Sequence, residues 1–131
     1  MTTIADNDPN DSLPLSPYTF HILMALARGE MHGYAIMVDV EERTDGQIII
    51  GPGTLYSSVK RMLKAGWIEE SDDRPDPDLD DERRRYYRLT DFGLRVARAE
   101  ADRLVQTFRL AEQSGLLRSR SALNLAEGPT R

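Results

Sequence analysis

The sequence predicts a mainly α-helical fold with a small β-hairpin, an α+β class, and three observations lead to this prediction. Apolar residues recur at helical spacing in three short segments between residues 16 and 65. After Gly66 the pattern changes to two short strand-like segments that flank a polar loop. From Asp91 onward the helical spacing returns and continues over several turns. A chain of 131 residues has room for one compact domain with one appended helix.

The first two helices have clear boundary signals. Ser16 offers a capping hydroxyl and Pro17 suits the first helical position, so a helix is predicted to begin here and to end at Gly29. The dipeptide at residues 32–33 predicts a turn, in which we expect His32 to make a local hydrogen bond with the backbone. Residues 34–43 then predict a second short helix.

A third helix is predicted over residues 55–65. The preceding residues 47–50 are β-branched and few, which favours a short strand or an extended connection, and residues 51–54 predict a turn. Within the helix, Leu55, Val59, Met62 and Leu63 recur at helical spacing and are expected to face the core. Gly66 supplies the C-terminal stop.

Residues 67–71 and 83–89 predict two strands joined by a loop rich in Pro and Asp. A helix-turn-helix followed by such a hairpin is the winged helix-turn-helix arrangement, and the hairpin is its wing. Thr90 is expected to cap a last helix from Asp91 to about residue 114, in which Gly93 permits close packing.

Apolar residues of this last helix recur in alternating steps of three and four, which is typical of a heptad seam. Such a narrow seam needs a partner in the same chain or in another one, and we expect it to form a homodimer interface. The seam consists of Leu94, Ala97, Ala101, Leu104, Phe108 and Ala111. The predicted organisation is an acidic disordered tail (1–15), a winged-helix domain (16–89), a dimerisation helix (90–115) and a flexible tail (116–131).

Composition excludes several classes of protein. The chain has no cysteine, which excludes disulfides, zinc ribbons, iron–sulfur clusters and a cysteine nucleophile. Its apolar runs are far shorter than the ~20 residues of a membrane helix, and the N-terminus lacks the pattern of a secretory signal, so we expect a cytoplasmic protein. No nucleophile–base or paired-carboxylate pattern is present. We therefore expect no enzyme activity, no metal and no cofactor.

The net charge of −5 argues at first sight against binding to nucleic acid. However, the acidic residues are concentrated in residues 1–15 and 72–82, and the rest of the chain is net basic. The acidic loop begins like a calcium-binding loop, but Asp81 stands where glycine is required and Tyr87 where glutamate is required. A solvated wing tip, turned away from DNA, is the better interpretation. The net charge alone does not decide the function.

The third helix and the second wing strand carry the candidate DNA-binding residues. Hydroxyls at the start of the helix and cations further along suit insertion into a major groove, whereas arginines on the wing suit phosphates. The helix residues are Thr54, Tyr56, Ser57, Ser58, Lys60, Arg61 and Lys64, and the wing residues are Arg84, Arg85 and Arg88. The alternatives are an ordinary solvated helix face, and arginines that pair with the acidic loop at 72–82.

Four motifs of the chain resemble the PadR-type transcriptional regulators in order and spacing, and together they cover about residues 16–93. The motifs are Gly29-Glu30-Met31-His32-Gly33-Tyr34, Gly53-Thr54-Leu55-Tyr56, Leu63-Lys64-Ala65-Gly66-Trp67-Ile68 and Arg84-Arg85-Tyr86-Tyr87-Arg88-Leu89-Thr90, with Gly93 following. The resemblance implies a winged-helix DNA-binding domain, a dimerising C-terminal helix, and repression that a small molecule often relieves. The chain departs from the family pattern at Glu30, where proline is usual, and in its last helix, which lacks tryptophan.

These observations predict a sequence-specific double-stranded DNA-binding transcriptional regulator, a repressor that acts as a homodimer on a pseudo-palindromic operator. The alternative is a winged-helix protein–protein interaction module without specific DNA binding. A small apolar or aromatic effector is the further partner that the resemblance implies. Four apolar residues of the first and last helices either line a pocket for it or form a filled core: Tyr18, Phe20, Leu104 and Phe108.

Overall fold

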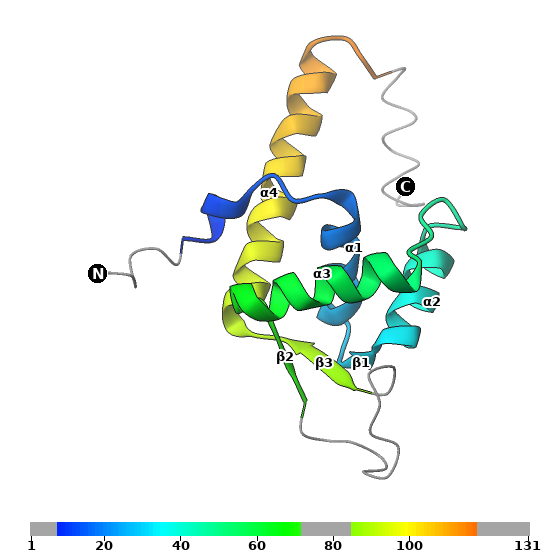
Figure 1. Cartoon of the computed structure of the whole chain (residues 1–131). Coiled ribbons are helices and arrows are strands. Elements are labelled where there is room, and N and C mark those ends of the chain that lie inside the picture. Colours follow the sequence, from blue (N-terminus) through cyan, green and yellow to red (C-terminus); the bar gives the residue numbers. More distant parts are fainter. Residues whose placement is uncertain (1–7, 72–84, 118–131) are drawn as a thin grey trace. The chain divides into compact units, whose positions relative to one another are not determined.

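The computed structural model describes residues 8–71 and 85–117 (Figure 1). Its elements are the 3-10 helix η2 (Pro9–Ser12), the helices α1 (Pro17–Ala27), α2 (Gly33–Arg43), α3 (Pro52–Ala65) and α4 (Asp91–Gln113), and the strands β1 (Met31–His32), β2 (Ile68–Glu70) and β3 (Tyr86–Leu89). The chain divides into two units, Met1–Glu100 and Ala101–Arg131. The predicted order of three helices, a hairpin and a last helix is confirmed.

The first unit contains a small antiparallel sheet with strand order β1-β3-β2 (Figure 1). The predicted hairpin is formed by β2 and β3, with Glu69 opposite Arg88. The strand β1 is an addition that the sequence did not predict, because two residues are too short to show alternation; His32 pairs with Tyr86 on β3. The sheet thus joins the turn before α2 to the base of the wing.

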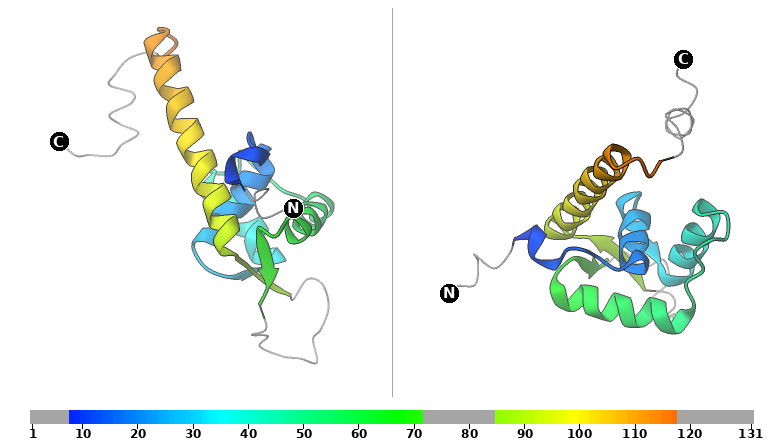
Figure 2. Two further views of the ribbon diagram at one scale, coloured as in Figure 1. Left: turned by 90° about the vertical axis from the view of Figure 1, so that its left-hand side faces the viewer. Right: turned by 90° about the horizontal axis from the view of Figure 1, so that it is seen from above.

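The core of this unit lies between α1, α2, α3 and the sheet, and the first turns of α4 contribute to it. In both views of Figure 2, α3 lies on the outer side of this unit, with one side turned away from α1. The largest fully buried apolar side chains are Ile22, Leu23, Ile36, Val40, Leu55, Met62, Ile68, Tyr87 and Val96. No helix within residues 8–71 and 85–117 has the length and apolar character needed to cross a membrane.

The predicted helix caps are confirmed. Ser16 Oγ accepts a hydrogen bond from the amide of Thr19 at 3.1 Å at the start of α1. His32 Nδ1 accepts from the amide of Ala35 at 3.1 Å and so caps α2. Each cap satisfies an amide that the first helical turn leaves without a partner. Three of the four helices therefore begin where a capping side chain occurs in the sequence, the third such cap being at Thr90.

Two expectations about chain segments need correction. The disordered tail was predicted to extend to residue 15, but η2 occupies Pro9–Ser12 and Leu15 packs against the core. The amide of Leu15 also donates to Glu100 Oε2 at 3.3 Å, which supplies a partner to a buried carboxylate. The third helix was predicted to begin at Leu55, but α3 begins at Pro52, where proline fits the first helical position. Of the two alternatives for residues 47–50, the structure has the extended connection.

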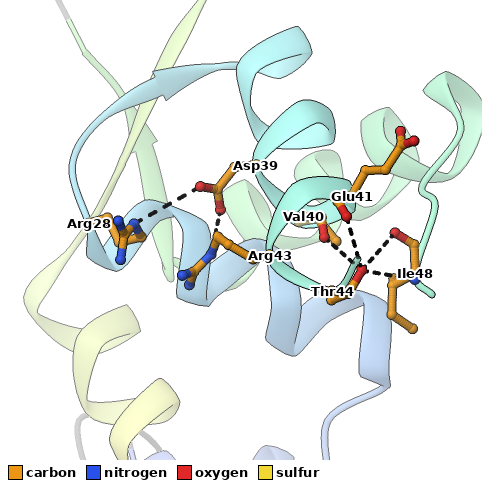
Figure 3. Close-up of polar contacts among 7 residues, drawn as sticks. All are labelled: Arg28, Asp39, Val40, Glu41, Arg43, Thr44 and Ile48. Atoms are coloured by element: carbon orange, nitrogen blue, oxygen red, sulfur yellow. Dashed lines mark hydrogen bonds and ion pairs between the residues drawn. The ribbon is translucent and has the colours of Figure 1, made fainter. Parts of the chain in front are cut away.

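The connection between α2 and α3 is held by a cluster of polar contacts (Figure 3). Thr44 Oγ1 donates to the carbonyl of Val40 at 2.9 Å and accepts from the amide of Ile48 at 3.0 Å. Asp39 Oδ2 lies 2.9 Å from Arg43 Nε one turn away on α2. The contacts of Thr44 tie the last turn of α2 to Ile48 in the connection that leads to α3, whereas the Asp39–Arg43 pair lies within α2.

We expect stability to decrease in mild acid because of His21, which lies half-buried on α1. Burial lowers the pKa of its imidazole below 6.5, and the positive charge of Arg43 adds to this effect. The unfolded chain therefore binds more protons than the folded protein as the pH falls through the unfolded pKa, and the free energy of unfolding decreases. Urea unfolding at about pH 7 and about pH 5 should show a smaller decrease in His21→Gln than in the parent. Equal decreases would exclude His21 as the source.

Candidate nucleic-acid interface

The outward face of α3 carries the polar residues that the sequence assigned to it, with two exceptions. Leu55, Val59 and Met62 are buried as predicted. The exposed side chains on the other side are Thr54, Ser57, Lys60, Arg61 and Lys64, which we call the outward face of α3. Its hydroxyls lie in the first turns and its cations in the later turns of the helix.

The placement of Ser58 on this face is wrong. Successive helical residues are rotated by about 100°, which puts Ser58 about 60° from Leu55 and about 40° from Met62, inside the buried arc. Ser58 is 1% exposed, and its Oγ accepts a hydrogen bond from Arg61 Nη2 at 3.3 Å. Ser58 therefore orients Arg61 and has almost no surface of its own for a ligand.

Tyr56 also differs from its predicted role. Its side chain lies at the edge of the buried arc, and its hydroxyl is buried against Gly33 at the start of α2. A Cβ atom at Gly33 would lie 2.4 Å from Tyr56 Oη, so a side chain there would displace the ring. The buried hydroxyl packs α3 against α2, and a contact from this atom to a base or phosphate is not available in this conformation.

The start of α3 leaves backbone amides open to solvent. Gly51 caps the helix without a side-chain hydrogen bond, and residues 51–54 are exposed. The amides of Gly53 and Thr54 belong to the first turn, which has no carbonyl partners within the helix. With the positive end of the helix dipole, these amides favour an anion at this position.

The described arginines at the base of the wing form ion pairs with glutamates of β2. Arg88 Nε lies 2.8 Å from Glu69 Oε2, its cross-strand neighbour, and Arg85 Nη1 lies 3.3 Å from Glu70 Oε2. The ion-pair partners of these arginines are thus carboxylates of β2, whereas one alternative from the sequence paired the arginines with the acidic loop at 72–82. Arg84 and residues 72–82 lie outside the described residues.

The cations of α3 have a different environment from those of the wing. In the part of the chain that the structure describes, no carboxylate forms an ion pair with Lys60, Arg61 or Lys64. Among the described residues, the outward face of α3 therefore combines hydroxyl groups with cations that form no ion pair, whereas Arg85 and Arg88 of the wing each pair with a glutamate. On this basis we expect α3 to attract a polyanion more strongly than these two arginines do.

The predicted seam of α4 is split between the two units. Ala97 is buried with the core of the first unit, beside Val96, and so has little surface left for a second copy, which corrects its assignment to the interface. Leu94 and Ala111 are partly buried, and Ala101 is exposed. In the second unit, Leu104 and Phe108 are 40% and 38% exposed. Val105 and Leu110, which the predicted seam does not include, are also exposed apolar residues of α4.

A helix-turn-helix that exposes a basic helix beside a β-hairpin defines the class of winged-helix transcriptional regulators. The family model of PadR-like transcriptional regulators matches residues 22–99. The chain therefore belongs to the PadR-like family, and the resemblance of the four motifs is confirmed. No match is found among curated protein sequences.

Solved structures agree with this assignment. A transcriptional regulator from Clostridium thermocellum is 27% identical, with a TM-score of 0.62, over 72% of this chain and 89% of that one. A PadR family transcription regulator from Clostridium difficile is 23% identical, with a TM-score of 0.63, over 75% and 97%. Bacillus subtilis PadR in complex with operator DNA is 24% identical, with a TM-score of 0.56, over 70% of this chain and 49% of that one. The last two establish similarity of fold.

Proposed function

We propose that this protein is a sequence-specific double-stranded DNA-binding regulator, which represses transcription as a homodimer on a pseudo-palindromic operator. The observation that carries the proposal is the outward face of α3, which presents hydroxyls and cations on an exposed helix of a helix-turn-helix, and the residues that the structure describes supply no ion-pair partner for these cations. The operator DNA bound by Bacillus subtilis PadR, a protein of similar fold, supports it.

On this proposal, the two ends of α3 have different tasks. Thr54 and Ser57 lie in the first turns, where side chains of a recognition helix reach base edges in the major groove. Lys60 and Lys64 lie in later turns, where they neutralise phosphates and hold the helix in register without reading sequence. Ser58 and Tyr56 support the helix from its buried side and are left out of the contact set.

On this proposal, the wing arginines contribute less to phosphate binding than the lysines of α3 do. For Arg88 to bind a phosphate, its guanidinium must leave Glu69 or be shared with it, because the two already form an ion pair at 2.8 Å. Arg85 is held in the same way by Glu70. A phosphate at the wing therefore gains less than one at Lys60 or Lys64, since it competes with an existing carboxylate.

We expect Lys64→Ala and Ser57→Ala to affect DNA binding differently. Loss of the Lys64 cation should weaken binding to operator and random duplex alike and flatten the salt slope by about one per subunit. Loss of the Ser57 hydroxyl should cost about 1–3 kcal/mol on the operator and little on random duplex. Fluorescence anisotropy on both duplexes at three salt concentrations measures both effects, and Arg88→Ala should change the slope less than Lys64→Ala.

The operator for these measurements can be obtained by selecting fragments of the source genome that the protein retains. The same preparation should bind heparin and random duplex, and salt should elute it from both. A folded dimer that binds neither at low salt would refute DNA binding and favour the protein–protein interaction module. If Ser57→Ala lowers affinity for both duplexes equally, the assignment of base reading to this residue is wrong.

A further inference from the structure

Two hollows meet on the surface of the first unit, over α2 and the connection that leads to α3. One hollow, of about 400 Å³, is lined mainly by apolar side chains, among them Met37, Pro52 and Tyr56. The other hollow, of about 560 Å³, lies over the end of α2 and is lined mainly by acidic residues. Val38 and Glu41 line both hollows, which therefore form one groove. We call it the α2 groove.

The change from apolar to acidic lining follows from the sequence of α2. Residues three and four positions apart lie on the same side of a helix. Tyr34, Val38 and Glu41 have this spacing, and Asp45 follows four residues later, just beyond the helix. One side of α2 therefore begins with an aromatic ring and ends with carboxylates.

The apolar end of the α2 groove is open to solvent. Tyr34, which lines it, is 63% exposed. Ile49, the neighbour in sequence of the lining residue Ile50, is 62% exposed. Covering side chains of this size removes apolar surface from water, and exposed apolar surface beside charged residues is typical of a contact with another protein. The apolar end therefore favours a large apolar side chain of a partner.

The acidic end of the α2 groove carries charge that does not stabilise the helix. Within residues 8–71 and 85–117, no cation forms an ion pair with Glu41, Glu42 or Asp45. Carboxylates near the C-terminal end of a helix also oppose its dipole. Figure 3 shows the carboxylate of Glu41 pointing away from the contacts of Thr44. A cation at this end would be attracted by the carboxylates and by the helix dipole together.

We propose that the α2 groove binds a short segment of another protein, in which a large apolar side chain stands within about four residues of a lysine or arginine. The apolar side chain enters the hollow beside Met37, and the cation lies against Glu41 at the end of α2. DNA does not fit this groove, because the carboxylates repel phosphates. No residue of the groove belongs to the outward face of α3, so the proposal does not rest on the proposed function.

A library of random peptides displayed on phage tests the proposal with the full chain as bait. The library is first depleted on a variant that combines Tyr34→Ser, Glu41→Lys and Glu42→Lys, which alters both ends of the groove. The acidic residues at 72–82 are present in both proteins, so the depletion removes peptides that these residues attract. We expect the peptides retained by the parent to share a large apolar residue with a lysine or arginine within about four positions of it.

A retained peptide, labelled with fluorescein, is then titrated with variants of each end of the groove. Glu41→Gln combined with Glu42→Gln should weaken binding at least about fivefold, because the cation of the peptide loses its partners. Tyr34→Ser should weaken binding by about the same factor, because apolar contact is lost. Glu30→Gln removes an exposed carboxylate that lines neither hollow and should change binding less than about twofold. Circular dichroism melts check that each variant is folded.

Three results would overturn the proposal. The first is a set of retained peptides with no shared pattern or without a cation. The second is unchanged binding in either groove variant, since the peptide then does not span both ends of the groove. The third is an oligomer of the parent that Glu41→Lys with Glu42→Lys dissociates in sedimentation velocity, which would assign the groove to a second copy of this chain. None of these measurements involves DNA, so a failure of the proposed function leaves them unchanged.

Discussion

Gly93→Ala should destabilise the protein by about 3 kcal/mol or more, because the new methyl group has no space. A Cβ atom at this position would lie 1.8 Å from the backbone carbonyl oxygen of Trp67. That oxygen cannot move away freely, since it accepts a hydrogen bond from the amide of Thr90 at 3.0 Å. Thr90 Oγ1 in turn donates to the carbonyl of Gly66 at 2.6 Å and caps α4 through the amide of Gly93 at 2.9 Å. The start of α4 is thus fastened to the end of α3.

Gly53→Ala is the matched control for this substitution. Gly53 lies in the first turn of α3, where a Cβ atom would meet nothing within 4 Å, and its φ angle is not positive. The same change should therefore leave the free energy of unfolding unchanged or raise it by up to about 1 kcal/mol. Urea unfolding followed by far-ultraviolet circular dichroism measures both variants. If Gly93→Ala is as stable as Gly53→Ala, the close approach to Trp67 is not a tight contact in solution.

The contact between Gly93 and Trp67 shows what the motifs of the sequence could predict and what they could not. Trp67 belongs to one family motif and Gly93 follows another, while Gly33 and Tyr56 belong to the other two. Each pair is brought into contact by the fold, at the ends of α3. The sequence predicts close packing at Gly93 but not its partner, because spacing along the chain does not show which distant residues come together in the fold. For the same reason Tyr56 was predicted to contact DNA, although its hydroxyl lies against Gly33.

The remaining differences between the predicted and the observed site concern residues that could lie on either of two faces of a helix. Helical spacing correctly placed Leu55 and Met62 inside and Lys60 outside. Ser58 was placed outside because its side chain is polar, although its angular position lies within the buried arc. On α4, the seam of alternating threes and fours overlaps the stripe that the first unit buries, and both include Ala97. Periodicity shows that a face is apolar, and only the tertiary structure shows which partner covers it.

Leu104→Asp should convert the proposed homodimer into monomers. Leu104, Val105 and Phe108 are 40%, 46% and 38% exposed on α4. Side chains of this size stabilise an association when they are buried, by roughly 1.5–3 kcal/mol each. A carboxylate at Leu104 would be buried without a partner twice in a symmetric dimer. We therefore expect the dissociation constant of the dimer to rise by at least about a hundredfold.

Gln106→Asp is the matched control, because it introduces the same charge two residues away on α4. With about 100° between successive residues, position 106 faces away from Leu104 and Phe108 and lies outside the seam. Sedimentation velocity at about 50 µM should give a dimer for the parent and for Gln106→Asp, and a monomer for Leu104→Asp. A monomeric parent at this concentration would refute the homodimer. A dimer in all three proteins would show that subunits associate through a different surface, because an unpaired carboxylate in the centre of an apolar interface is not tolerated.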